Sequence, residues 1–423
     1  MNSRLPNHRL HRTREQRIQI SGFATLACAI TQLLAPVKRG VMRLSAGLAL
    51  LFSFVAAFLT VWIVAPPPQT VFWIIALVTG EWSLWPGALG LAGAVLGAVS
   101  ARRLSARGRV AACLAVLLGL TAAGFSLVPL ATTLPVARAN AVHLSLGEYV
   151  RGVSEMAPGP DVTTNTVSYR TVAKQTLRLD VYRRTNGGST PHPAIVVVHG
   201  GSWRGGTKSD FAAWDRWLAR SGFVIFDIEY RIAPQPNWQA ATGDVQNAIV
   251  WVKRNAARYD VNPARVALLG RSAGAHLALI AAYTAKNDPA TRVSAVVSLY
   301  GPTDLVWGYR NPANPRVLDT SAVLRAFLGG TSETAPDAYE AASPLAHVGP
   351  NTPPTLLFHG GRDALVSPRH SVFLADKLRA AGVPHQAVFL PYAQHGFDYD
   401  NHGWGAQVVR PVLLRFLRAH LRG

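Results

Sequence analysis

The stretch Gly270-Arg271-Ser272-Ala273-Gly274 decides the fold of the larger part of this chain. A short apolar run, 266–269, precedes it, and a run rich in alanine and leucine, 275–281, follows it. This pattern predicts a buried strand that turns sharply into a buried helix, with Ser272 at the turn. Such a turn exposes the serine hydroxyl at the end of the sheet. In a chain rich in glycine and alanine the motif can also arise by chance, so its neighbours must support it.

Outside this turn, from residue 161 onward, the sequence alternates between expected strands and helices. The expected elements are an antiparallel pair at 163–169 and 176–182, further strands at 194–198, 223–228, 266–269, 293–299, 355–358 and 386–390, and helices at 211–221, 240–257, 275–281 and 408–421. Several of these strands are continuous apolar runs, which is typical of strands buried on both faces. The alternation predicts an α/β fold with a mostly parallel sheet covered by helices on both sides.

Two polar residues follow later strands and complete a candidate catalytic set. A serine hydroxyl needs a base to accept its proton and an acid to orient that base. Asp363 and His395 each follow a strand end, where the sites of open α/β sheets form. We predict that His395 accepts the proton of Ser272 and that Asp363 orients His395. Taken singly, an aspartate in a turn more often bonds its own backbone, and a lone histidine is usually an ordinary polar residue.

The loop after strand 194–198 reads His199-Gly200-Gly201-Ser202-Trp203. Glycines allow backbone N–H groups to approach an oxyanion closely. We therefore predict that the N–H groups of Gly200, Gly201 and Ala273 form an oxyanion hole, with a plain Gly-Gly turn as the alternative. Ser202, Trp203 and Arg271 are the predicted substrate-binding residues.

Residues 161–423 resemble an α/β-hydrolase of the esterase and lipase type. They are similar to hormone-sensitive-lipase-like esterases and closer to the bacterial feruloyl and acetyl esterase group. The motifs that carry the resemblance are His199 to Trp203, Glu229-Tyr230-Arg231-Ile232-Ala233-Pro234, Gly270 to Gly274 with His276, Gly301-Pro302-Thr303-Asp304, Asp363, and His395-Gly396-Phe397. The resemblance implies an α/β-hydrolase fold and a serine carboxylesterase that acts on short-chain acyl esters without cofactor or metal.

The sequence departs from this family pattern at two positions. Ser202 stands where a third glycine is usual, and Ala275 stands where a glycine is common. Neither change removes a predicted N–H donor, although Ser202 can alter the acyl pocket.

Residues 305–348 fall between two core strands and are predicted to form a small cap, while Tyr230 to Pro234 and Asp304 are expected to be scaffold. The alternatives are a peptidase or amidase, a membrane-lipid esterase or acyltransferase, and a non-catalytic binding module.

The N-terminal third has a different composition. The chain has 423 residues, 49% of them hydrophobic, and a net charge of +20. Residues 1–150 contain thirteen basic and three acidic residues, which flank apolar segments without interleaved aromatic residues, so no nucleic-acid partner is expected. Both cysteines, Cys28 and Cys113, lie in this third. From residue 150 onward a cysteine nucleophile, a disulfide or a zinc–cysteine site is therefore excluded.

Three apolar runs, 44–65, 71–99 and 110–130, predict about three transmembrane helices and hence a lipid bilayer partner. The second run is expected to be one kinked span, interrupted by Gly80-Glu81 and Pro86. Cleavage of a signal peptide would not explain the two later runs. Residues 1–43 are predicted to be a basic cytoplasmic arm whose segment 18–37 is interfacial or loosely ordered, unless translation starts at Met42. Residues 131–160 are a predicted linker or an arm on the next domain.

Basic residues decide the predicted topology. They precede the first run and follow the second, so the positive-inside rule predicts a cytoplasmic N-terminus and an extracytoplasmic catalytic domain at 161–423. The sequence leaves the natural acyl and alcohol groups and the oligomeric state open.

Overall fold

A computed structural model describes the chain except for residues 1–13, 103, 153–155, 187–189, 286–287 and 422–423. The described chain divides into two compact units. One consists of residues up to 58 together with 87–123, and the other consists of 59–86 together with 124–423. The first unit is helical, and the second contains the whole β-sheet.

The first unit is built from parts of α1 (Arg14–Val64), α3 (Leu84–Ala101) and α4 (Ala106–Ala139). Small residues let these helices approach closely. A Cβ atom at Gly93 would lie 2.4 Å from the Ser53 hydroxyl, and one at Gly119 would lie 2.3 Å from a backbone carbonyl. Large apolar side chains, among them Leu51, Phe54 and Leu117, are exposed. The segments Gly40–Val64, Leu84–Ala101 and Ala106–Ala139 are long and apolar enough to cross a membrane.

Two segments differ from the expectations for the N-terminal third. Residues 18–37 belong to the continuous helix α1, so they are not loosely ordered, while the interfacial position stays a prediction. The run 71–99 forms two helices, α2 (Thr70–Glu81) and α3, so it is not one kinked span. Because α2 has 12 residues, it is about 18 Å long, too short for a hydrocarbon core of about 30 Å. The expected linker contains the end of α4 and a short helix, α5 (Leu146–Arg151).

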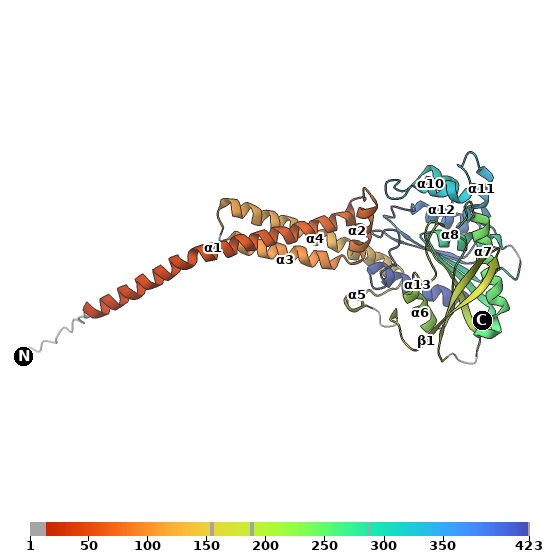
Figure 1. Cartoon of the computed structure of the whole chain (residues 1–423), viewed down its shortest axis with the longest axis horizontal. Coiled ribbons are helices and arrows are strands. Elements are labelled where there is room, and N and C mark those ends of the chain that lie inside the picture. The colour runs from red at the N-terminus through yellow and green to blue at the C-terminus, as the bar shows by residue number, and fades with distance from the viewer. Residues whose placement is uncertain (1–13, 103, 153–155, 187–189, 286–287, 422–423) are drawn as a thin grey trace, which may run out of the picture. The chain divides into compact units, whose positions relative to one another are not determined.

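The second unit contains one eight-stranded sheet, which confirms the predicted α/β architecture (Figure 1). Its order is β1-β2-β4-β3-β5-β6-β7-β8, with β1 and β2 antiparallel and the strands from β4 to β8 mutually parallel. The strands are β1 (Val162–Val172), β2 (Gln175–Arg184), β3 (His192–Val198), β4 (Val224–Ile228), β5 (Val261–Arg271), β6 (Ala295–Leu299), β7 (Thr355–Gly360) and β8 (His385–Leu390).

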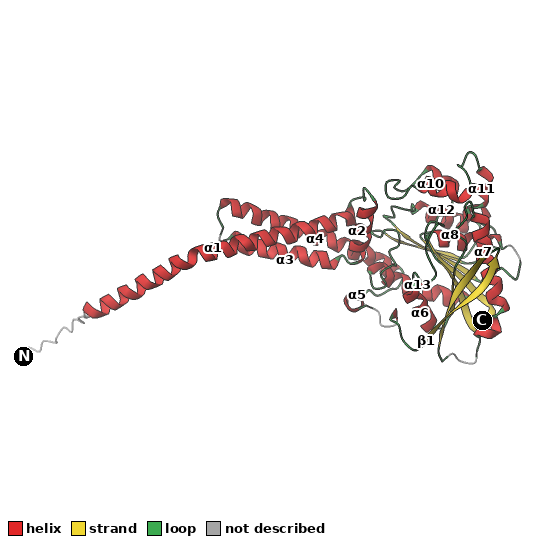
Figure 2. Ribbon diagram, viewed as in Figure 1, coloured by secondary structure: helices red, strands yellow, loops and turns green. Residues whose placement is uncertain are grey.

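Helices connect the strands and cover both faces of the sheet (Figure 2). They are α6 (Ala212–Arg220), α7 (Trp238–Arg254), α8 (Ala273–Thr284), α9 (Leu305–Arg310), α10 (Thr320–Leu328), α11 (Pro336–Ala341), α12 (Arg369–Ala380) and α13 (Trp404–His420), with short 3-10 helices η2 (Ala256–Tyr259) and η3 (Pro344–His347). The segment 305–348 contains α9, α10, α11 and η3.

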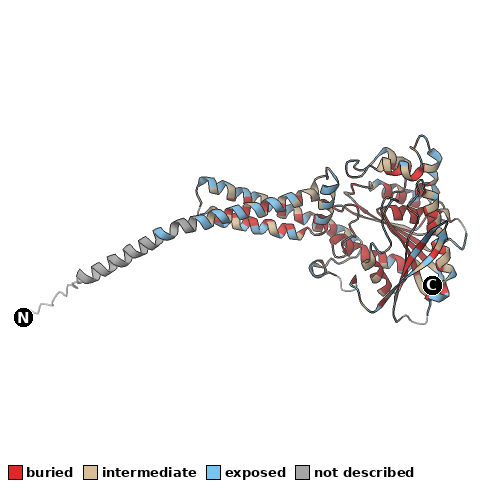
Figure 3. Ribbon diagram, viewed as in Figure 1, coloured by how far each residue is buried: buried red, intermediate tan, exposed pale blue. Residues whose placement is uncertain are grey.

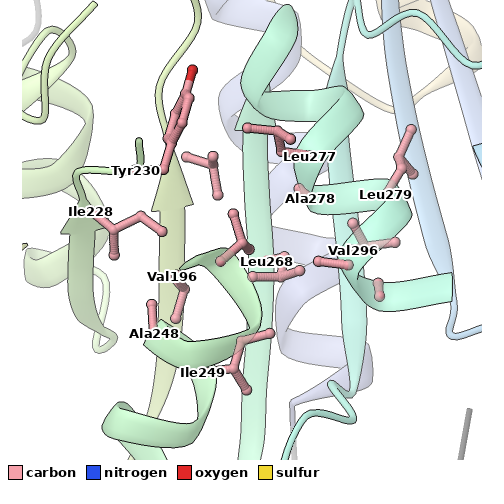
Figure 4. Close-up of a cluster of buried hydrophobic side chains, with 14 of the residues drawn as sticks. Val196, Ile228, Tyr230, Ala248, Ile249, Leu268, Leu277, Ala278, Leu279 and Val296 are labelled. Atoms are coloured by element: carbon pink, nitrogen blue, oxygen red, sulfur yellow. The ribbon is translucent and has the colours of Figure 1, made fainter. Parts of the chain in front are cut away.

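The core follows from the alternation of side chains along the buried strands. In β3, Val196 belongs to a cluster with helices α7 and α8, whereas Ile195 and Val197 belong to a cluster with α6 and α13. Figure 3 shows these central strands buried, and Figure 4 shows Val196 of the first cluster near Ile249 and Leu268. The sheet is therefore covered on both faces, which fixes the parallel strands whose ends carry the site.

Candidate active site

Ser272 lies between β5 and α8 in a strained backbone conformation. Its φ of 53° and ψ of −121° are unusual for a residue with a side chain. The motif glycines make this turn sterically possible: a Cβ atom at Gly270 would lie 2.3 Å from the carbonyl oxygen of Gly274, and one at Gly274 would lie 2.1 Å from that of Val198. The N–H of Ser272 donates to the carbonyl of Leu299 at 2.9 Å. The turn thus exposes the hydroxyl as the sequence predicts.

The three predicted catalytic side chains lie in one hydrogen-bonded row. His395 Nε2 lies 2.8 Å from the hydroxyl oxygen of Ser272. His395 Nδ1 lies 2.7 Å from Asp363 Oδ2. Because the Asp363 carboxylate accepts a hydrogen bond from Nδ1–H, the ring proton stays on Nδ1 and Nε2 is left free to accept the serine proton. The geometry is that of a nucleophile, a base and an orienting acid.

Asp363 is held ionised although it is buried. Its Oδ1 accepts hydrogen bonds from the N–H groups of Leu365 and Val366, each at 2.8 Å. Its Oδ2 lies 3.2 Å from His359 Nε2, in addition to its contact with His395. Burial by itself raises the pKa of Asp363, but the charges and hydrogen bonds of the two histidines outweigh it and hold this pKa well below its usual value.

The contact between His359 and Asp363 was not predicted from the sequence. Its Nδ1 pairs with the hydroxyl of Ser371 at 2.7 Å, and its Nε2 lies 3.0 Å from the carbonyl of Val366. The ring is therefore fixed beside Asp363 from two directions. Its position at the end of β7 was visible in the sequence, but nothing in the sequence indicated the direction of its ring.

The glycine loop after β3 lies directly against the nucleophile. A Cβ atom at Gly200 would lie 3.3 Å from Ser272 Cβ. Gly201 has φ of 114°, where a side chain would also collide with the loop backbone. Ala273 is the first residue of α8, where an N–H has no acceptor within the helix. The structure therefore brings Gly200, Gly201 and Ala273 together beside Ser272.

The two residues that follow these glycines line the pocket in front of Ser272. Ser202 and Trp203 both have left-handed backbones, with φ of 53° and 56°. Trp203 stacks on Phe327 with ring centroids 4.2 Å apart and meets His276 edge-on at 5.1 Å. Both predicted substrate-binding residues therefore line the pocket that contains Ser272.

This pocket contains Ser272 and His395 and is bounded mainly by apolar side chains, which come from Pro302, from the segment 305–348 and from the loop after Asp363. They are Pro302, Leu305, Pro312, Ala313, Leu318, Val323, Leu324, Leu365 and Val366. Such a lining suits the hydrocarbon part of a ligand, while the polar groups at one end fix its reacting atom.

His370, on α12, also lines the pocket and was not predicted. Its Nδ1 accepts hydrogen bonds from the N–H groups of Thr303 and Asp304 at 3.2 and 3.3 Å, so the ring proton resides on Nε2. Burial lowers the pKa of His370 to about 3, which keeps the ring neutral. Only the fold places this side chain near Ser272, since it is about one hundred residues away in sequence.

The sequence predicts that Arg271 binds substrate, but in the structure Arg271 does not line the pocket. Its buried guanidinium donates to Asp398 Oδ2 at 2.6 Å and lies 4.0 Å above the ring of Phe211. These contacts hold the guanidinium away from the residues that line the pocket. We assign Arg271 to a buried ion pair rather than to substrate binding.

Comparisons with known proteins support the fold described above. Residues 179–378 match the model of the BD-FAE family. Solved structures that resemble the chain include a truncated carbohydrate esterase from gut microbiota, with a TM-score of 0.53, 23% identity, and coverage of 63% of this chain and 99% of that one. A bacterial heroin esterase has a TM-score of 0.54, 20% identity, and coverage of 66% and 89%. The second unit has the α/β-hydrolase fold.

Three curated proteins that the chain resembles come from Mycobacterium tuberculosis. Esterase LipC is 35% identical over 52% of this chain and 57% of the relative, and esterase LipQ is 31% identical over 57% and 60%. The probable carboxylic ester hydrolase LipM is 33% identical over 52% and 53%. The chain thus spans a little more than half the length of these relatives.

Proposed function

We propose that this protein is a serine carboxylesterase whose nucleophile is Ser272. The observation that carries the proposal is the row from Ser272 through His395 to Asp363, with contacts of 2.8 and 2.7 Å. The similarity to LipC, LipQ and LipM supports an ester hydrolase.

In the proposed mechanism, Ser272 Oγ attacks the ester carbonyl carbon while His395 Nε2 accepts its proton. The oxyanion that forms is stabilised by the N–H groups of Gly200, Gly201 and Ala273. When the ester C–O bond breaks, His395 returns the proton to the departing alcohol. Water then attacks the acyl-enzyme with the same base, and this step releases the acid and restores Ser272. Asp363 stabilises the imidazolium in both halves of the reaction.

Replacement of the nucleophile tests this proposal. We expect purified full-length protein to hydrolyse p-nitrophenyl acetate and butyrate, and Ser272→Ala to abolish that activity with unchanged circular dichroism. A fluorophosphonate probe should label the unmodified protein and not the variant. Unchanged activity in Ser272→Ala would contradict the mechanism. Faster cleavage of aminoacyl amides than of matched esters would favour a peptidase instead.

We also propose that the second unit lies outside the cytoplasm. Lys38, Arg39 and Arg43 lie at the start of the first candidate span, and the sequence has four basic residues at 102–109, around the end of α3 and the beginning of α4. If all three candidate spans cross the membrane, both basic segments lie on one side, and the positive-inside rule makes that side the cytoplasm. A reporter fused after residue 423 that was active only in the cytoplasm would contradict this topology.

A further inference from the structure

Helix α2 has two unlike faces. The inner face is buried at Ala76, Thr79, Gly80 and Glu81. The outer face presents Val71, Ile74 and Val78 at helical spacing, with 55%, 48% and 41% of each residue exposed. A stripe of three exposed β-branched residues on one short helix indicates a surface that is covered by an apolar environment.

The inner face of α2 is fixed to the loop that carries His395. A Cβ atom at Gly80 would lie 3.6 Å from the ring of Tyr392, and one at Gly396 would lie 4.0 Å from Leu77 Cδ2. Tyr392 and Gly396 stand on either side of His395 in the sequence. The helix therefore rests directly on the loop of the proposed catalytic base.

The last residue of α2 anchors the helix in a close-fitting socket. Glu81 Oε1 accepts a hydrogen bond from the hydroxyl of Tyr392 at 2.7 Å, and Oε2 accepts one from the N–H of Gly405 at 3.2 Å. A Cβ atom at Gly403 would lie only 2.2 Å from Glu81 Oε2. These contacts fix which face of α2 points away from the catalytic unit.

The first residue of α2 and the segment before it contact the rim of the active-site pocket. The side-chain amide of Asn314 donates to the carbonyl of Pro67 at 2.7 Å, and the hydroxyl of Thr70 donates to that of Val317 at 2.8 Å. Asn314 and Val317 lie next in sequence to pocket-lining residues. Arg362, beside Asp363, donates to the carbonyl of Val64. The pocket rim and α2 therefore share one edge of the catalytic unit.

Chain continuity identifies what covers the outer face. One candidate span ends at Val64, six residues before α2 begins, and the next begins at Leu84, three residues after α2 ends. A helix this short between two spanning helices stays at one membrane surface. Helices of this kind bury their apolar face about 5–10 Å into the lipid boundary.

We propose that Val71, Ile74 and Val78 insert into the bilayer surface, and that the adjacent active site hydrolyses amphiphilic esters held in that bilayer. The inference rests on the proposed esterase function and specifies its substrate class. The acyl chain occupies the apolar pocket, the bond from Ser272 Oγ to the acyl carbon forms, and the ester bond to the lipid alcohol breaks. The alcohol leaves with the proton from His395, and water releases the fatty acid.

Spin labelling tests the surface independently of activity. The full-length chain with Cys28 and Cys113 replaced by serine carries a nitroxide at Ile74→Cys and is reconstituted in phosphatidylcholine vesicles. We expect oxygen to relax this label more than a water-soluble nickel chelate does. A label at Val372→Cys, on α12, is the matched control because Val372 is 40% exposed; it should show the reverse. Greater access for the nickel chelate at residue 74 would overturn the proposal, and so would protection from both reagents, which would indicate a protein partner or a second copy.

Activity measurements test the substrate class. Ile74→Lys should lower hydrolysis of p-nitrophenyl palmitate in the same vesicles by about tenfold, because a charge weakens insertion of the helix. Hydrolysis of dissolved p-nitrophenyl acetate should stay within about twofold, because the outer face does not touch Ser272 or its partners. Val372→Lys should change neither rate. Equal loss on both substrates, or no loss on the palmitate, would overturn the inference. Failure of the unmodified protein to cleave either ester would instead contradict the esterase function.

Discussion

Asp363 and Glu81 are two buried carboxyl groups of the same unit whose surroundings shift their pKa values in opposite directions. Asp363 has two backbone N–H donors and two histidines, and its pKa is held well below the usual value. Glu81 has one hydroxyl and one N–H, and burial raises its pKa to about 8 despite these hydrogen bonds. Burial alone therefore does not decide the charge of a carboxyl group, whereas its donors and neighbouring charges do.

The difference corresponds to two tasks. Asp363 must be an anion to stabilise an imidazolium during the proposed reaction. Glu81 instead joins α2 to Tyr392 and to the start of α13, and as a neutral acid it can do so without the cost of a buried charge. Four changes test this contrast, from the largest expected effect to the smallest.

Asp363→Asn should have the largest effect. Asparagine has nearly the same shape but cannot stabilise the protonated base, so kcat for p-nitrophenyl butyrate should fall by about 10⁴-fold. Thermal stability at pH 7 should change far less than activity. A loss of less than tenfold would show that Asp363 is not the orienting acid.

Arg271→Leu tests a third buried carboxyl group, Asp398, whose charge is compensated by a full ion pair. Removal of the guanidinium leaves that carboxylate without its cation, and the free energy of unfolding should fall by about 3–5 kcal/mol. At temperatures where the variant stays folded, KM should be nearly unchanged, because Arg271 does not line the pocket. A large rise in KM with unaltered stability would restore the substrate-binding role predicted from the sequence.

Glu81→Gln tests the raised pKa through the pH dependence of stability. Between the unfolded pKa near 4.5 and the folded value of about 8, the folded protein holds a proton that the unfolded chain has lost. The contribution of Glu81 is therefore fully present below pH 4.5 and decreases by up to about 1.4 kcal/mol per pH unit as the pH rises to 8.

The measurement for Glu81 is the difference in melting temperature between the two proteins from pH 5 to pH 8. Glutamine cannot ionise, so the variant should become more stable relative to the unmodified protein as the pH rises. Asp363 has the opposite sign, because its stabilisation is present above the unfolded pKa and is lost at lower pH. A difference that does not change with pH would show that Glu81 is already ionised in the folded protein.

His359→Gln should have the smallest effect. It removes one of the groups that hold Asp363 ionised, but His395 and two backbone N–H groups remain. We expect kcat/KM to fall by about three- to tenfold, with a larger loss at low pH, as Asp363 becomes easier to protonate. A loss as large as that of Asp363→Asn would make His359 an equal member of the catalytic set. A loss that is the same at every pH would assign it a packing role.

The sequence by itself determined the features that depend on local pattern. The apolar run before Ser272 and the small residues around it require a strand, a tight turn and a helix, and alternation along the chain requires a mostly parallel sheet. Because parallel strands end at one edge, Asp363 and His395 could be placed beside Ser272 from their positions after two strands. Long apolar runs indicated the candidate membrane spans without any tertiary information.

Only the tertiary structure decided the direction of side chains and the interruption of the second apolar run. Arg271 pairs with a residue 127 positions away. His359 and His370 are oriented by Ser371 and by the N–H groups of Thr303 and Asp304. The run 71–99 is apolar enough for one long helix, yet it divides at Trp82. There Glu81 enters a socket formed by residues more than 300 positions later. A sequence pattern reports how much of a residue is buried, but its bonding partner is chosen by the fold.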